Sequence, residues 1–433
     1  MRLPARDAPV DETRGYLLAA PAVKARRAWT GVVLVAAAVL MVARAPVYVT
    51  APSFWAEEGT LLFAFAWNHT FAAALAYRPA GYLLLYATTA TAIAAQLVRA
   101  GLVALEHAPR VTVLCALAMQ LVPVALIAWS RAPFWDGILR RTAGVAIVLF
   151  GALTDEVWLN TINCQPWLTI ATALLLLEPQ APGWTCALVA LAGLSAPVAC
   201  TLLPLFAWRA FRVRTRVAVA HAVVLATAAV VQIACVASAW DPSMERRTAG
   251  LDLGVFAVTI WARAIVVPTL GVDVATRALE TVRGSVWVEP LGGLVLLMTA
   301  AALMGWIARG LRGDARLLVG AFVLTTTCTL LTSAGGKTML MNSPWASSRY
   351  FYAPGVLFLL AILGMIRRDA GRARVIVGGL VLAFGLAHGI AVYPTVRWQP
   401  GWPRWGDEVA AWRADPAREL RIWPPPWKVG LQP

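Results

Sequence analysis

The chain has 433 residues, of which 60% are hydrophobic and only 14% are charged. Apolar runs close to the length needed to cross about 30 Å of hydrocarbon recur from Thr30 to Tyr393. The runs are continuous and rich in Leu, Ala and Val, which excludes the alternating strands of a membrane β-barrel. We therefore predict an all-α, polytopic membrane protein with roughly 10–12 apolar segments and interfacial helices in its outer loops.

Basic residues give a net charge of +15, but they fall in short clusters between the apolar runs. The clusters lie at the N-terminus and near 209–216, 309–316 and 367–374, which the positive-inside rule places in the cytoplasm. Nucleic acid is therefore not an expected partner. The membrane domain is expected over 1–393 and an outer tail over 394–433. Predicted later spans are 217–239, 291–308, 317–333, 351–366 and 375–393, and predicted outer loops are about 49–79, 155–163, 241–289 and 334–350.

Two adjacent carboxylates, Glu57 and Glu58, follow the first apolar run. Acids at a bilayer surface are costly unless water, a partner or chemistry stabilises them. Charge counting places the pair outside whether residues 79–98 cross the membrane or lie in its interface, so both acids are candidate catalytic groups. The structural alternative is a solvated pair at the positive end of an interfacial helix.

The segment Pro79–Val98 follows, and it contains enough Thr to be less apolar than its neighbours. We favour a helix lying in the interface, while a full crossing is the alternative. Arg78 and Tyr82, at the start of this segment, are candidate substrate-binding residues. A second polar group on the outer side follows at 154–163, and its candidate substrate-binding residues are Asp155, Glu156, Asn160 and Asn163. Capping of a span terminus is the structural alternative for the two acids.

Two later apolar runs are interrupted. Trp184–Trp208 contains Pro197, which removes a backbone donor and clashes with the preceding turn, so two short helical pieces or a kinked span are expected. Leu253–Gly271 contains Arg263 and Pro268, and charge counting favours an interfacial helix there over a span.

A third polar group lies near 335–352, where Lys337, Arg349 and Tyr350 are candidate substrate-binding residues. Lys and Arg bind phosphate as a point charge and as a bidentate fork, respectively. Snorkelling at the start of the next span is the alternative for Arg349. The Trp-rich tail is expected to form an aromatic belt or a lid on the outer surface, and sugar stacking is the alternative.

A carboxylate motif after the first span, a second acidic/Asn motif and a helix broken by Gly and Pro resemble the GT-C superfamily of integral-membrane glycosyltransferases. More closely, the chain is similar to uncharacterised bacterial polytopic membrane proteins of that fold. The residues that carry this resemblance are Phe54-Trp55-Ala56-Glu57-Glu58-Gly59, Gly81-Tyr82-Leu83, Asn160 to Trp167, Gly193 to Pro204, Arg349-Tyr350-Phe351 and Pro424-Pro425-Pro426-Trp427. Many relatives carry Glu-Asp where this chain has Glu57-Glu58.

The resemblance implies a hexosyltransferase of the bacterial inner membrane, with a cytoplasmic N-terminus and a periplasmic C-terminus. It implies transfer of a sugar from a polyprenyl-phosphate donor to an envelope glycan, lipid or protein. Glu57, or else Glu58, would act as general base, and Arg349, with Arg78 and Lys337 behind it, would stabilise the donor phosphate. The acids at 155 and 156 could orient the acceptor, stabilise charge on the sugar or hold a divalent cation, so metal use is left open.

Two other classes fit a polytopic chain with broken helices. A transporter or lipid flippase usually shows internal repeats and charges at mid-bilayer, whereas the acids here cluster at predicted span ends. A non-catalytic membrane scaffold is the third class. Replacement of the acids would distinguish a scaffold, which tolerates it, from an enzyme.

Overall fold

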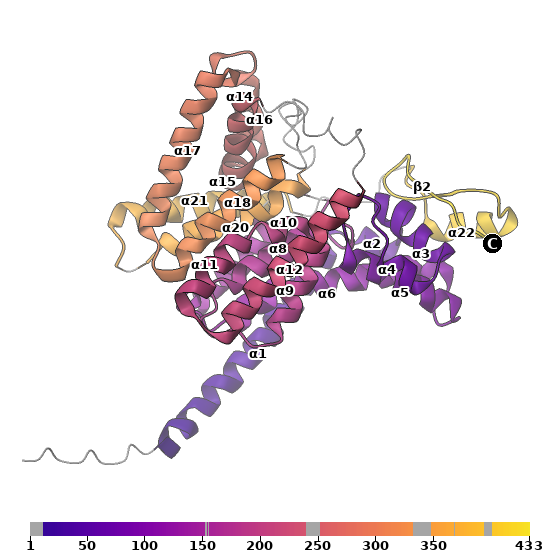
Figure 1. The fold of residues 1–433 in the computed structure, drawn as a ribbon, viewed down its shortest axis with the longest axis horizontal. Helices are drawn as coiled ribbons and strands as arrows, with labels where there is room; N and C mark the ends of the chain where they lie inside the picture. The colour runs from indigo at the N-terminus through magenta and orange to yellow at the C-terminus, as the bar shows by residue number, and fades with distance from the viewer. Residues whose placement is uncertain are drawn as a thin grey trace, which may run out of the picture.

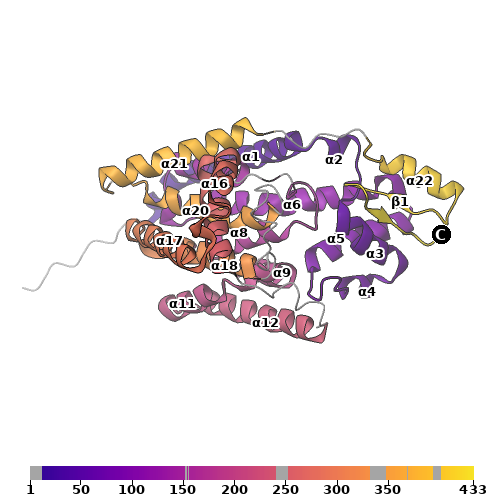
Figure 2. The same ribbon diagram turned by 90° about the horizontal axis from the view of Figure 1, so that it is seen from above.

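The computed structural model of this protein describes residues 12–151, 154, 156–239, 252–331, 348–367, 369–393 and 401–433. Most of these residues lie in helices and very few in strands (Figures 1 and 2). One small antiparallel sheet pairs β1 (Leu420–Arg421) with β2 (Lys428–Val429). The all-α prediction from composition is confirmed.

Six helical stretches of the described chain are long and apolar enough to cross a membrane. In four of them, only 22% to 28% of the most apolar window is buried inside the protein. So much exposed apolar surface is unfavourable in water and is stabilised by lipid. The chain is therefore a multi-pass membrane protein. The stretches are Arg27–Arg44 in α1 (Glu12–Arg44), Leu105–Trp129 in η2 (Leu105–His107) and α6 (Ala108–Trp129), α12 (Arg216–Ser238), Leu253–Leu270, α17 (Pro290–Gly310) and α21 (Arg372–Ala391).

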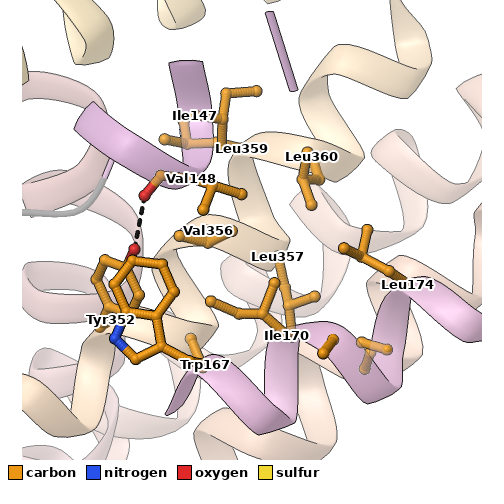
Figure 3. Close-up of a cluster of buried hydrophobic side chains, with 14 of the residues drawn as sticks. Ile147, Val148, Trp167, Ile170, Leu174, Tyr352, Val356, Leu357, Leu359 and Leu360 are labelled. Carbon is orange, nitrogen blue, oxygen red and sulfur yellow. Dashed lines mark hydrogen bonds between the residues drawn. The ribbon is translucent and has the colours of Figure 1, made fainter. Parts of the chain in front are cut away.

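Two shorter apolar helices, α8 (Gln165–Leu175) and α20 (Arg349–Met365), form the centre of the molecule (Figure 3). Both are apolar on nearly every face, and a helix of that kind is stable only when other elements surround it. They pack with α7 (Ile138–Phe150), where the buried Tyr352 hydroxyl donates to the Val148 carbonyl at 2.6 Å. Beside α20 lies α18 (Leu317–Thr329), preceded by η6 (Gly313–Arg316), and η3 (Pro133–Trp135) precedes α7.

The helix break at Pro197 is confirmed. The helix α9 (Thr185–Ser195) and the pair α10 (Pro197–Cys200) and α11 (Leu203–Val213) meet at 119°. The Gly193 carbonyl beside the break accepts the Gln232 side-chain amide at 2.9 Å. A Cβ at Gly193 would lie 2.5 Å from Ala228, so this close approach to α12 requires glycine.

Leu253–Leu270 is one continuous helical stretch made of α14 (Leu253–Thr259), the π-helix η4 (Ile260–Val266) and α15 (Val267–Leu270). Its 18 residues can cross a bilayer by length and composition, so its interfacial placement stays a prediction. With α16 (Val272–Val282), η5 (Val286–Val288) and α17 it forms an arm at the top of Figure 1. The helix α5 (Leu85–Arg99) is about 22 Å long at 1.5 Å per residue. That is shorter than about 30 Å of hydrocarbon, which favours the predicted interfacial helix over the full crossing for this segment.

Elements from the two ends of the sequence lie together on the right of Figure 1. We call this part of the molecule the distal end. Its elements are α2 (Val47–Thr50), η1 (Glu58–Phe63), α3 (Ala64–Asn68), α4 (Phe71–Leu75), α5, and the C-terminal segment 401–433 with α22 (Trp405–Ala414), β1 and β2. In both views the start of α1 lies toward the opposite side of the molecule.

Candidate functional site

The two adjacent acids have different environments because a tight turn precedes the π-helix η1. Ala56 adopts a positive φ of 39°, which L-residues other than Asn and Asp rarely adopt. Glu57 then occupies the N-cap of η1, and Glu58 is the first residue of that helix. Strained backbone and π-helical turns are both common at functional sites, so this turn is a candidate functional site.

Glu58 is an internal anchor. It is only 2% exposed. Its Oε1 accepts the Thr161 backbone N–H at 2.7 Å and the Thr161 hydroxyl, and its Oε2 accepts the Trp55 N–H at 3.4 Å. Burial raises the pKa of the Glu58 carboxyl, and the hydrogen bonds from Thr161 and Trp55 lower it only in part. Glu58 therefore joins the turn after α2 to the segment that follows α7.

Glu57 is half-buried and points to different partners. Its Oε2 is buried and has no hydrogen-bond partner among the residues that the structure describes. Its charge acts on the Arg349 guanidinium and on the Tyr82 hydroxyl. Burial raises the pKa of Tyr82, which also bonds to the Gln165 side chain at the start of α8, so this phenol is neutral at physiological pH. Of the two acids, Glu57 is the one with a buried carboxylate oxygen that no described residue binds.

The second polar segment is held by its own asparagines. The Asn160 amide donates to the carbonyls of Glu156 and Trp158 at 2.8 and 3.1 Å, and its oxygen accepts the Asn163 backbone and side-chain amides. Asn163 also donates to the Glu156 carbonyl at 2.9 Å. Leu159 has a positive φ of 53°, so this loop is strained as well. Here the asparagines support Glu156, and their contact with substrate stays a prediction.

Arg349 and Glu156, which were both candidates from the sequence, come together in the structure. The Arg349 Nη1 lies 3.8 Å from the Glu156 Oε2, and both side chains are about a quarter exposed, at 28% and 27%. The Arg349 guanidinium also lies 5.1 Å from the centre of the Tyr350 ring. A hydrogen bond from the Ser348 hydroxyl to the Thr154 hydroxyl, at 2.7 Å, joins the start of α20 to the 154–163 segment. This bond explains how residues almost 200 positions apart share one site.

Arg263 is a member of the site that the sequence analysis did not select. It lies in the π-helix η4, is 2% exposed, and its guanidinium sits 4.7 Å above the Phe351 ring. Its charge interacts with that of Glu156. The signal was present in the sequence, since an arginine inside an apolar run is a functional candidate by default. The charge count there assigned Arg263 only to an interfacial helix.

The remaining candidates lie elsewhere or beyond the described residues. Arg78 is exposed, and its guanidinium donates to the Ser238 hydroxyl at the end of α12 at 3.3 Å, so no contact joins it to Glu57 or Arg349 in the described chain. Asp155 and Lys337 lie outside the described residues. Among the residues described, no three His, Cys, Asp or Glu side chains converge as metal ligands. The divalent cation therefore stays a prediction.

An open groove of about 690 Å³ lies at the distal end, lined by residues at or near α3, α4 and α5. It contains none of the predicted site residues. Its lining residues are Asn68, His69, Thr70, Phe71, Ala73, Gln96 and Arg99. The Arg99 guanidinium there donates to backbone carbonyls of residues 66 and 69, so it mainly ties α5 to the end of α3.

No protein-family profile, curated protein or solved structure matches this chain. Its class is defined by fold and composition: it is an all-α, multi-pass membrane protein with a strained, charged site formed from four separate parts of the chain. These parts contribute Glu57, Glu156, Arg263 and Arg349.

Proposed function

We propose that this protein is a GT-C-type glycosyltransferase of the bacterial inner membrane. In this proposal it moves a sugar from a polyprenyl-phosphate donor to an acceptor in the cell envelope, and Glu57 is the general base. One observation carries the proposal: the buried Glu57 Oε2 has no hydrogen-bond partner among the described residues, while Arg349 lies within electrostatic range of it. A free carboxylate beside a cation suits a reaction that removes a proton at one atom and releases an anion at another.

The proposed reaction is a single displacement at the anomeric carbon. Glu57 accepts the proton of an acceptor hydroxyl as that oxygen bonds to the anomeric carbon. The bond between the anomeric carbon and the phosphate oxygen breaks, and its electron pair leaves on the lipid phosphate. Arg349 and Arg263 stabilise the developing negative charge on the phosphate, because cations fixed where that charge develops lower the free energy of the transition state.

Glu156 has a supporting role in this proposal. It interacts with both arginines. A buried guanidinium without a counter-charge is costly, so Glu156 stabilises the arginines before a phosphate arrives. Its fixed position on the Asn160 and Asn163 hydrogen bonds keeps both cations near the same point.

The orientation belongs to the same proposal. The basic clusters between spans support a cytoplasmic N-terminus, a periplasmic C-terminus and a distal end on the periplasmic side. The donor's lipid tail would then lie in the membrane beside the exposed apolar helices, and the acceptor would arrive from the periplasm.

The test is transfer of radiolabelled sugar by purified protein in lipid nanodiscs, with a panel of polyprenyl-phosphate sugars and envelope acceptors. Wild type is compared with Glu57→Gln and with Glu280→Gln, which replaces an exposed acid on α16 far along the chain. We expect Glu57→Gln to lose about 10²-fold or more of the rate, the usual contribution of a general base, and Glu280→Gln to lose nothing.

Equal transfer by wild type and Glu57→Gln would refute Glu57 as the base. Absence of transfer by wild type with every donor would overturn the glycosyltransferase proposal. Movement of a labelled lipid across the bilayer without sugar transfer would instead support the flippase alternative.

A further inference from the structure

The C-terminal segment 401–433 makes backbone hydrogen bonds on both sides of Trp55. The Trp423 N–H donates to the Phe54 carbonyl at 3.2 Å, and the Ala56 N–H donates to the Trp423 carbonyl at 2.5 Å. This pattern is a parallel β-bridge between Trp55 and Trp423, residues separated by most of the chain. Residues 54–56 are therefore bound to the C-terminal segment up to the position before Glu57.

Side-chain packing fixes this bridge. Trp423 is fully buried, and its indole N–H donates to the Pro403 carbonyl at 2.8 Å. Its ring lies 5.5 Å from Tyr48 in an edge-on arrangement and 4.9 Å from Trp402. Buried aromatic pairs of this geometry add to the free energy of area burial. Trp423 therefore anchors the C-terminal segment beside the end of α2.

The same segment also contacts the chain just after the acids. A Cβ at Gly59 would lie 2.6 Å from the Ile422 Cδ1 and 3.1 Å from the Val429 side chain, so the backbone of η1 approaches the hairpin closely. The Thr60 hydroxyl donates to the Lys428 carbonyl at 2.7 Å. Glu57 and Glu58 thus lie between two contacts with one distant segment.

These contacts bear on the strained residue. A non-glycine residue in the left-handed region is strained and persists only when its surroundings determine it. The N–H of Ala56 is bound by Trp423, and two residues later the Glu58 carboxyl is bound by Thr161. Glu57 lies between these two fixed points, so its direction depends on both.

We propose that the C-terminal segment is a positioning element for Glu57, with Trp423 as the positioning residue. The inference rests on the proposed role of Glu57 as general base. The segment touches no reacting atom; it holds the Ala56 turn in the conformation that directs the Glu57 carboxylate to the site. Displacement of a catalytic group by about 1 Å can cost 10²-fold in rate, so a contact of this kind is enough to control activity.

The segment has internal support for this role. Glu408 on α22 is 3% exposed and accepts hydrogen bonds from the Arg421 backbone N–H at 3.1 Å and from its guanidinium at 2.6 and 2.9 Å. Arg418 adds a bond at 3.2 Å. These bonds tie α22 to β1 directly before Trp423, so the residue is presented by a rigid unit.

The experiment uses the full-length protein in nanodiscs with the variants Trp423→Ala and Trp423→Phe. Trp184→Ala is the control, because Trp184 is an exposed tryptophan at the N-cap of α9, outside the C-terminal segment. Two quantities are measured for each protein: hydrogen–deuterium exchange in the peptide that contains residues 54–58, and kcat and KM for sugar transfer.

For Trp423→Ala we expect exchange at residues 54–58 to be about tenfold faster, the ratio for loss of one ordinary hydrogen bond. We expect kcat to fall about 10-fold to 100-fold while KM for the donor changes less than about twofold, since donor contacts lie elsewhere. Trp423→Phe keeps an aromatic ring and should fall between wild type and Trp423→Ala. Trp184→Ala should match wild type in both measurements.

Unchanged exchange in both Trp423 variants would overturn the proposed contact, whether or not the protein transfers sugar. Faster exchange with kcat unchanged, alongside an inactive Glu57→Gln, would overturn the positioning role and leave the proposed function intact. If Trp423→Ala does not fold, the Trp423→Phe variant decides by the same two measurements.

Discussion

The sharpest prediction concerns the two adjacent acids. We expect replacement of Glu58, but not of Glu57, to lower the stability of the fold. Glu58→Ala removes the acceptor of two backbone N–H groups, those of Thr161 and Trp55. Glu57→Gln removes no hydrogen bond of the described structure at its Oε2. The first change should therefore destabilise the fold, and the second should change activity alone.

The magnitude follows from the geometry. A buried donor left without a partner costs about 1–3 kcal/mol. The 2.7 Å bond from Thr161 justifies about 2 kcal/mol, and the long 3.4 Å bond from Trp55 about 1 kcal/mol. The Thr161 hydroxyl can rotate and is not counted. The expected loss for Glu58→Ala is about 3 kcal/mol, against less than about 0.5 kcal/mol for Glu57→Gln.

The assay measures the midpoint of thermal unfolding in detergent. The readout is the fraction of protein that stays monodisperse at each temperature. At about 2.1 cal/mol/K per residue, complete unfolding of a chain of this length changes the entropy by about 0.9 kcal/mol/K. A loss of about 3 kcal/mol then lowers the midpoint by at least about 3 °C, and by more if helices persist in the micelle. Glu280→Ala is the control at an exposed acid.

A Glu58→Ala midpoint within about 1 °C of wild type would refute the anchoring role of Glu58. A lowered midpoint for Glu57→Gln would refute the assignment of Glu57 as the acid that is free of structural bonds. Either result would reverse the division of roles between the two residues.

Further predictions concern pH, the C-terminal segment, the strained turn and the core. Because burial raises the folded pKa of Glu58 above its ordinary value of 4.5, its contribution to stability is complete below that pH and is lost as the pH rises through the folded pKa. The midpoint of thermal unfolding of wild type should therefore fall relative to that of Glu58→Gln as the pH rises above 4.5, and parallel curves would contradict this. Burial raises the pKa of Glu408, but the hydrogen bonds and charge of its arginine partners outweigh burial and lower it. The stabilisation that Glu408 provides is thus present above its ordinary pKa and lost as the pH falls through the lowered value. Glu408→Gln should lower the free energy of unfolding by about 2 kcal/mol and speed proteolysis of the C-terminal segment. Ala56→Gly should leave the midpoint unchanged or raise it, whereas Ala56→Val should lower stability by more than about 1 kcal/mol; equal midpoints would show that the positive φ stores no strain. Tyr352→Phe, which removes the 2.6 Å bond to Val148, should cost about 1 kcal/mol by the same thermal assay, and an unchanged midpoint would argue against that bond.

Several features of the fold could be predicted from the sequence because they depend on local chemistry. Long apolar runs can satisfy their backbone groups in lipid only as helices, so the spans near 217–239, 291–308 and 375–393 appear as α12, α17 and α21. Pro197 breaks its helix by losing a donor and clashing with the turn before it, whatever the rest of the chain does.

The candidate site was only partly predictable. Arg349 and Glu156 were selected because ionisable residues beside apolar runs are energetically costly and often functional. The structure places the Arg349 Nη1 3.8 Å from the Glu156 Oε2. Arg78 met the same criterion, yet its guanidinium bonds to Ser238 instead. Arg263 met it too and was not selected, because its partners at 156 and 351 come from distant segments.

The sequence by itself determined that this chain is a helical membrane protein, and it identified Glu57 and Glu58 as candidate catalytic acids. It ranked Glu57 first as base but contained no physical difference between two identical, adjacent carboxylates. Tertiary structure supplied the difference, because Thr161 binds one acid and Trp423 fixes the turn before the other. Hydrogen bonds of that kind depend on which distant backbone groups meet, and this is decided by packing and not by local sequence.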